Sequence, residues 1–117
     1  MTSQTLTRGE VVLTRFPFTD LTGASLRPAI IVSQGQIGRD VVLMAVSSVV
    51  RGSLAPTDFT VDSTHSEFPM TGLRVTSVIR THKLAAVEQS VIVRRLGHLG
   101  PQLQAEVDRN LHLVLGL

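Results

Sequence analysis

Residues 16–33 read FPFTDLTGASLRPAIIVS, and this stretch decides the fold because it joins two strand patterns through a loop. The run that leads into it, residues 11–16 (VVLTRF), is rich in β-branched and aromatic residues and stops at a proline. This pattern predicts a first strand. Residues 19–25 (TDLTGAS) have the aspartate and glycine of a tight loop. The apolar run at residues 28–32 predicts a second strand, with Arg27 at its mouth.

Short apolar runs of the same kind continue along the chain. They predict strands at residues 41–46, 59–61, 75–79, 84–87 and 90–96. We expect the strand at 28–32 to form a hairpin with 41–46, and 84–87 to form another with 90–96. Many short strands without alternating helices favour a small barrel over βαβ units.

The tail changes period after Gly100 and Pro101. Apolar residues recur every four positions, at Leu103, Val107, Leu111 and Leu115. This spacing predicts an amphipathic helix with proline in its first turn and Gly116 as its stop. The expected fold is therefore mainly β with a C-terminal α-helix.

Length and composition limit the class of protein. A chain of 117 residues that is 43% apolar and 17% charged predicts one globular domain over residues 1–117. The absence of cysteine argues against disulfides and thiolate metal sites, and the N-terminus does not read as a signal peptide. No apolar run approaches the ~20 residues of a membrane helix. We therefore expect a cytoplasmic protein.

The basic residues are almost all arginine: ten of the eleven, with Lys83 as the only lysine, although the net charge is just +2. Arginine binds phosphate bidentately, so this bias is compatible with nucleic acid or with acidic partners. Codon usage in a high-GC genome would produce the same bias.

The motifs of several common enzyme classes are missing. Neither GxGxxG nor GxxxxGKS occurs, so nucleotide cofactors have no support, and GxSxG is absent as well. The four histidines show no metal-ligand spacing; they are His65, His82, His98 and His112. We expect neither a cofactor nor a metal.

Arg27 is the most informative single residue. Pro28 favours extended backbone at Arg27 and so fixes the arginine at the start of a core strand, beside the loop. From composition alone, a rim arginine lying over apolar side chains remains the simpler interpretation.

Longer stretches of the chain resemble a known family. RGEVVLTRFPF (8–18), TDLTGASLRPAIIVS (19–33) and MAVSS (44–48) resemble the MazF and PemK family of toxin endoribonucleases. The resemblance continues through TGLRVTS (71–77) and through residues 94–117. It implies a compact SH3-like barrel of the CcdB, Kid and MazF kind with one long terminal helix.

The resemblance also implies an activity. Members of this family are toxins of type II toxin-antitoxin systems, mRNA interferases that cut single-stranded RNA at short motifs without a metal. They leave a 2′,3′-cyclic phosphate and a 5′-hydroxyl, with the RNA 2′-hydroxyl as nucleophile. The family's arginine before proline matches Arg27, and its strand-end Thr or Ser matches Ser47. Arg27 would clamp the phosphate while the Ser47 hydroxyl holds a non-bridging oxygen.

The proton acceptor and donor stay open at this point. Arginine is a poor proton shuttle because its pKa exceeds ~12. Histidine suits proton transfer better, and His82 stands where many relatives carry an acidic residue. The loop before Arg27 lacks the glutamate of some relatives, so Asp20 is the nearest carboxylate there. Asp20 and His82 are the possible acid and base.

RNA binding needs cations and stacking surfaces. Only 3% of the chain is aromatic, and it contains no tryptophan or tyrosine. Phe18, at the edge of the loop, is the best stacking candidate. Ser48 competes with Ser47, but neighbouring strand residues point to opposite faces. The remaining candidates for contact with RNA are Arg15, Thr19, Arg74, Arg80 and Lys83.

The resemblance implies two protein partners and leaves two other functions open. Relatives form two-fold dimers and are silenced by an antitoxin whose acidic tail fills the RNA groove. One alternative is a CcdB-like DNA gyrase poison, but those toxins depend on a C-terminal tryptophan and this chain ends LVLGL. The other is a non-catalytic SH3-like module that binds nucleic acid or protein.

Overall fold

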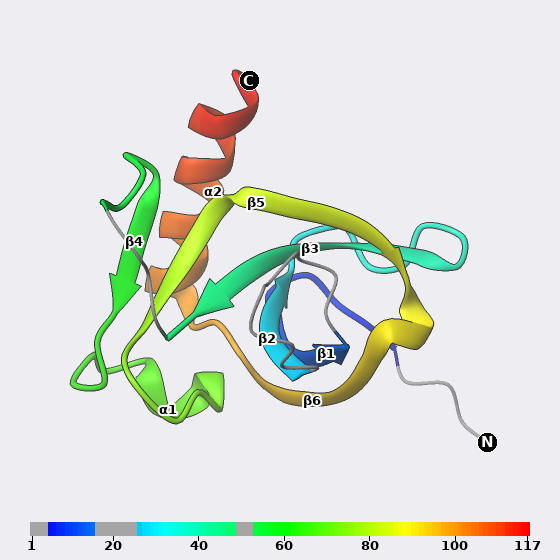
Figure 1. Ribbon diagram of the computed structural model, residues 1–117, viewed down its shortest axis with the longest axis horizontal. Coiled ribbons are helices and arrows are strands. Elements are labelled where there is room, and N and C mark those ends of the chain that lie inside the picture. Colours follow the sequence, from blue (N-terminus) through cyan, green and yellow to red (C-terminus); the bar gives the residue numbers. More distant parts are fainter. Residues whose placement is uncertain (1–4, 16–25, 49–52) are drawn as a thin grey trace.

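Six antiparallel strands and a C-terminal helix make up the fold in the computed structural model, which describes residues 5–15, 26–48 and 53–117 (Figure 1). The sheet runs in the order β4-β5-β3-β2-β1-β6. The strands are β1 (Glu10–Arg15), β2 (Leu26–Ile31), β3 (Asp40–Ser47), β4 (Asp58–Val61), β5 (Ser77–Glu88) and β6 (Ile92–His98). The helices are α1 (Phe68–Thr71), the 3-10 turn η1 (Gln89–Val91) and α2 (Pro101–Leu115).

The predicted mainly-β fold with a terminal helix is confirmed, and the sheet is curved but open. Figure 1 shows β2, β1 and β6 curling round one end of the sheet, and within the described residues the edge strands β4 and β6 do not pair. The arrangement is compatible with a small barrel-like fold. The predicted hairpin of the second and third strands is confirmed by the pairs from Ala29↔Ala45 to Ile31↔Leu43.

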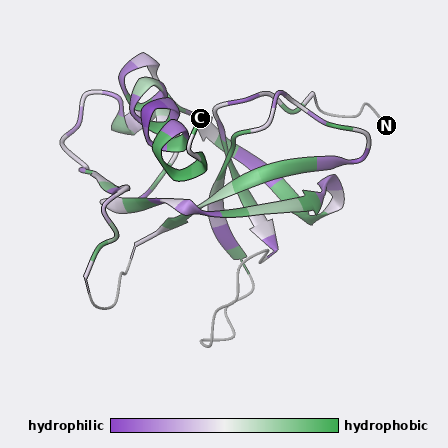
Figure 2. Ribbon diagram, turned by 90° about the horizontal axis from the view of Figure 1, so that it is seen from above, coloured by the Kyte–Doolittle hydropathy of each residue, from purple (hydrophilic) through white to green (hydrophobic). Residues whose placement is uncertain are grey.

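Alternation along the strands divides the core into two layers. One layer, on what we call the helix face, includes Val11, Ile30, Met44, Val46 and Ile79 and packs against Leu103 and Val107 of α2. The other, on what we call the far face, is formed by Leu6, Val12, Ala29, Ile31, Val41 and Leu43. β1, β2 and β3 therefore contribute buried side chains to both layers. Figure 2 shows α2 lying against one side of the sheet.

Helix α2 begins and ends as its sequence predicts. Pro101 occupies its first turn, and Gly116 ends it in the left-handed conformation with φ of 70°. Leu103 and Val107 are buried, whereas Leu115 is 54% exposed, so the apolar stripe is covered only over the first half of the helix.

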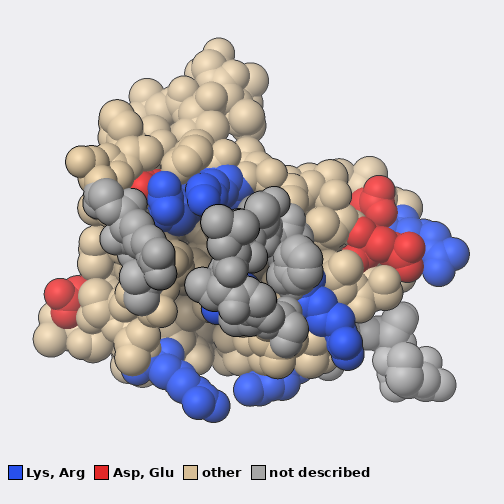
Figure 3. All heavy atoms as spheres, viewed as in Figure 1, with Lys and Arg blue, Asp and Glu red and all other residues tan. Residues whose placement is uncertain are grey.

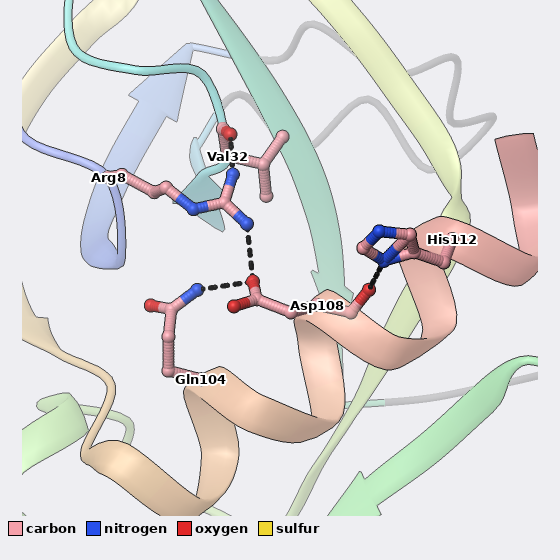
Figure 4. A network of polar contacts seen from close by, with 5 residues as sticks. All are labelled: Arg8, Val32, Gln104, Asp108 and His112. Atoms are coloured by element: carbon pink, nitrogen blue, oxygen red, sulfur yellow. Dashed lines mark hydrogen bonds and ion pairs between the residues drawn. The ribbon is translucent and has the colours of Figure 1, made fainter. Parts of the chain in front are cut away.

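A polar network fastens the N-terminal segment to this helix (Figure 4). The Arg8 guanidinium contacts the Val32 carbonyl and the Asp108 carboxylate. Gln104 Nε2 donates to Asp108 Oδ1 at 2.9 Å from one turn earlier. The contacts join the N-terminal segment, the end of β2 and the middle of α2, and so fix α2 across the helix face.

Two sequence predictions are wrong. Residues 75–79 and 84–87 do not form separate strands, because β5 runs unbroken from Ser77 to Glu88. The last strand, β6, pairs with β1 and not with residues 84–87, so the predicted second hairpin does not form. Local apolar runs do not show which strands pair with each other in the sheet. After β5, η1 turns the chain, and β6 becomes the edge strand beside β1, at the end of the sheet opposite β4. Helix α1 was not predicted.

Within the described residues no helix combines the length and the apolar composition needed to cross a membrane.

Candidate functional site

Arg27 is the second residue of β2, at the strand start where the sequence places it. It pairs with Thr14 of β1, whose fully buried hydroxyl donates to the Arg27 carbonyl at 3.1 Å. The Arg27 side chain is only partly buried. The backbone of Arg27 is therefore held in place by β1.

Ser47 ends β3, beside the start of β2. The regular pairing of the two strands ends at Ala29↔Ala45. Two residues further along each strand are Arg27 and Ser47, and side-chain alternation puts both on the face of that alanine pair. Ser47 is partly buried, while Ser48 lies beyond the strand and is exposed. The described geometry thus sets Arg27 and Ser47 on the far face at neighbouring strand ends.

Arg80 belongs to the same face on the next strand. It stands opposite Ala45 of β3 and opposite Asp58 of β4. Its Nε lies 2.9 Å from Asp58 Oδ2, and the two side chains are 17% and 0% exposed. The Nε–H is not aimed closely enough at the oxygen to make a hydrogen bond, so the contact is an ion pair. Arg80, a predicted RNA contact, is therefore oriented by a buried carboxylate.

His82 lies two residues further along β5, at an irregularity in the sheet. The β3–β5 register shifts between Met44↔Leu84 and Ala45↔Arg80, so the intervening residues of β5 have no partner on β3. His82 Nδ1 is 3.5 Å from Asp58 Oδ1, and the imidazole is 40% exposed. The bulge therefore lets His82 join the group that contains Arg80, although it is not in the regular ladder.

Asp58 is the residue that sequence reasoning missed. An aspartate before the short run FTV reads as a turn residue, and its burial depends on β5, which is distant in sequence. Its Oδ2 also accepts a hydrogen bond from the Ala55 backbone N–H at 2.8 Å. The one signal in the sequence was an acid placed directly before a strand whose Phe59 and Val61 are buried.

The other predicted contacts are more scattered. Arg15 ends β1 opposite Leu26, Lys83 follows His82 in the bulge, and Arg74 lies in the segment before β5; all three are exposed. Asp20, Phe18 and Thr19 lie outside the described residues. Lys and Arg atoms gather over the middle of β5 on the face shown in Figure 3. A gathering of cations over β5 is what contact with a phosphate chain requires.

A groove lies on the helix face, away from these residues. It has a volume of about 340 Å³ between the C-terminal half of α2 and the strands, and its apolar lining includes Val42, Leu84, Leu111 and Leu115. Among the described residues, none of the predicted site residues lines it. In the described part of the chain, no group of three or more His, Asp or Glu side chains is placed to hold a metal ion.

The comparisons with known proteins agree with this fold. The chain is similar to a mycobacterial endoribonuclease solved in complex with its cognate antitoxin, at 23% identity and a TM-score of 0.69, covering 95% of each chain. It is also similar to MazF from Deinococcus radiodurans, at 20% identity and a TM-score of 0.73, covering 98% of this chain and 100% of that one. No curated protein matches the chain in sequence.

The family is shown by sequence as well. Residues 7–115 match the family model described as PemK-like, MazF-like toxin of type II toxin-antitoxin system. The match covers nearly the whole chain, including both strands that carry Arg27 and Ser47. The chain is a member of the PemK-like and MazF-like toxin family of type II toxin-antitoxin systems.

Proposed function

We propose that the protein is an endoribonuclease toxin that cuts single-stranded RNA without a metal, at a short sequence motif. The observation that supports this most is the placement of Arg27 and Ser47 at adjacent strand ends on one face, with Arg80 on the next strand. Two arginines and a hydroxyl, held by backbone pairing, form a donor set for a phosphate that gains charge during reaction.

The proposed chemistry uses the RNA's own 2′-hydroxyl. Its oxygen attacks the neighbouring phosphorus, the bond to the 5′-oxygen breaks, and the products are a 2′,3′-cyclic phosphate and a 5′-hydroxyl. Arg27 binds the phosphate with two parallel hydrogen bonds, and Ser47 donates to a non-bridging oxygen. One proton leaves the 2′-hydroxyl and another reaches the 5′-oxygen; Asp20 and His82 are the candidates for these transfers.

We also propose the partners. Arg15, Arg74 and Lys83 supply cations for the phosphate chain, while Phe18, Thr19 and Ser48 complete the RNA contacts. An antitoxin partner is in line with the similar endoribonuclease that was solved with its cognate antitoxin. In this proposal the antitoxin carries an acidic segment that competes for the same basic face. The protein acts as a homodimer, which would extend the basic face across two copies.

The test is cleavage of an RNA that contains a long randomised segment, so that every short motif is present. The purified protein is incubated with this RNA in EDTA, and the ends are mapped. We expect discrete cuts with cyclic-phosphate ends, and a rate that falls roughly 10² to 10³-fold in Arg27→Ala because a phosphate donor is lost.

The matched control is Arg39→Ala. Arg39 is exposed, with a side chain 82% accessible, and contacts Glu88 at 3.8 Å. It directly precedes β3 and lies about 26 Å along that strand direction from Ser47, at ~3.3 Å per residue. The control should cut at the wild-type rate. An intact randomised RNA would contradict the ribonuclease; gyrase-dependent DNA breaks or binding without cleavage would then identify one of the two alternatives.

A further inference from the structure

Asp58 has one carboxylate oxygen that the fold itself does not use. The side chain is fully buried, and Oδ2 is occupied by the Ala55 N–H at 2.8 Å and by Arg80 Nε at 2.9 Å. Oδ1 is buried and makes no hydrogen bond. Buried acceptors nearly always have a hydrogen-bond donor. A buried carboxylate oxygen without one, on the strand next to Arg80, therefore needs a physical explanation.

The imidazole of His82 faces this oxygen. Its Nδ1 lies 3.5 Å from Asp58 Oδ1, a long contact of the sort that shortens when a substrate closes the site. Because the ring is 40% exposed, it touches the buried carboxylate and the solvent at once. A histidine that gives its Nδ1–H to a carboxylate keeps Nε2 as the acceptor and has its ring orientation fixed.

The charges around the ring favour this arrangement. Arg80 lies against the same carboxylate and supplies the positive charge that compensates it. The contact between His82 Nδ1 and Asp58 is therefore not the main source of compensating charge for this carboxylate. Lys83, the next residue of β5, is a second cation there and is exposed.

We propose that Asp58 is a positioning residue that holds His82 with Nε2 toward the RNA as the general base, an assignment that rests on the proposed ribonuclease function. Nε2 accepts the proton of the 2′-hydroxyl as its oxygen bonds to phosphorus. The electron pair of the broken bond goes to the 5′-oxygen, which takes its proton from water. The imidazolium then returns its proton to solvent.

The first test compares Asp58→Asn and His82→Gln with the control Asp40→Asn. Asp40 is an exposed acid at the start of β3, the end of the strand away from Ser47. The substrate is the shortest RNA that the wild-type protein cuts. We expect kcat to fall roughly 10²-fold or more in the first two variants, the size of a lost general base, with little change in KM. The Asp40→Asn control should match wild type.

The double variant tests whether Asp58 acts through His82. In a His82→Gln background, Asp58→Asn should cost little further rate, because two residues that act as one unit are not additive. A loss in the double variant equal to the product of the two single losses would overturn the positioning role. His82→Gln replaces an exposed side chain, so it reports on the chemistry even if Asp58→Asn fails to fold.

Two readouts separate a base from an acid or a structural residue. Added imidazole should raise the rate of His82→Ala and leave Arg27→Ala unchanged. An RNA with sulfur in place of the bridging 5′-oxygen needs no proton on its leaving group, so the His82→Gln defect should persist with it. Disappearance of the defect would make His82 the acid and overturn the assignment.

The outcomes also separate this inference from the proposed function. If the wild-type protein cuts RNA and both Asp58→Asn and His82→Gln cut at the wild-type rate, the inference alone is wrong. If the wild-type protein leaves the randomised RNA intact, the ribonuclease itself is wrong, and the base assignment goes with it.

Discussion

Asp58 and Glu67 are both buried carboxylates, and they differ in how their oxygens are used. Glu67 is 5% exposed, and its Oε1 and Oε2 accept hydrogen bonds at 2.9 Å from the backbone N–H groups of Leu103 and Gln102. These are orphan donors of the first turn of α2, where the helix dipole also favours a negative charge. Both oxygens of Glu67 are thus bound by the fold, whereas Asp58 Oδ1 makes no hydrogen bond and faces His82 Nδ1 at 3.5 Å.

The difference suggests a criterion for buried acids. A carboxylate with both oxygens bound to backbone N–H groups stabilises an element and leaves nothing for a substrate. A carboxylate with one oxygen facing an exposed histidine can orient that histidine. Mutation of the first should change stability with unchanged chemistry, and mutation of the second should change chemistry more than stability.

Glu67→Ala gives the largest expected change in stability. It removes two hydrogen bonds to a charged acceptor and leaves the start of α2 without its cap, so we expect the free energy of unfolding to fall by about 3 kcal/mol. Urea denaturation measures it, and cleavage per folded molecule should stay at the wild-type value. A loss of activity with intact stability would reverse the roles assigned to the two acids.

Gly100→Ala tests the same cap from the other side. An added Cβ would lie 2.3 Å from Glu67 Cδ, so the carboxylate must leave the helix start. The backbone φ of −78° suits alanine, which returns up to about 1 kcal/mol by restricting the unfolded chain. Set against the lost cap, the net destabilisation should be about 2 kcal/mol. In a Glu67→Ala background the same change should cost almost nothing, and an undiminished cost there would show that the glycine acts otherwise.

Arg95→Ala extends the comparison to a third acid, Glu10, whose partner is half exposed. Arg95 Nε lies 2.6 Å from Glu10 Oε2, and the side chains are 51% and 9% exposed. In Arg95→Ala, water can solvate Glu10 Oε2 in place of the half-exposed arginine, and the Thr7 N–H still donates to Glu10 Oε1. We therefore expect the free energy of unfolding to fall by about 1 kcal/mol. The loss should shrink in added salt, which screens exposed charges. A loss that is independent of salt would mean that packing, and not charge, is involved.

The elements that local pattern controls could be predicted. Arg27 at a strand start, the hairpin of β2 and β3, and the ends of α2 at Pro101 and Gly116 each follow from neighbouring residues. The partner of β6 and the continuity of β5 depend on contacts between distant strands, so periodicity could not reveal them. For the same reason, neither buried acid was predicted: Asp58 is buried by β5, and Glu67 by a helix 35 residues later.

Asp62 gives the smallest expected change in stability, because its carboxylate accepts hydrogen bonds but is exposed to solvent. The backbone N–H of Thr64 donates to Oδ1 at 3.0 Å, and the Thr64 hydroxyl donates to it at 2.9 Å. These hydrogen bonds, the backbone one first, hold the pKa of Asp62 below its ordinary value of 3.8. The stabilisation is therefore present above that value and is lost as pH falls through the lower pKa of the folded state.

Thr64→Ala removes the hydroxyl and keeps the backbone donor. We expect the pKa of Asp62 to rise only part of the way to its ordinary value, as followed by an NMR titration of the side-chain carboxyl group. Stability at neutral pH should barely change, because a carboxylate in water loses little when one donor is replaced by solvent. The matched variant Ser66→Ala, at an exposed serine after the turn, should leave the Asp62 titration where it is. An unmoved pKa of Asp62 in Thr64→Ala would show that the backbone N–H alone lowers this pKa. The two hydrogen bonds to this exposed acid would then not contribute separately to the shift.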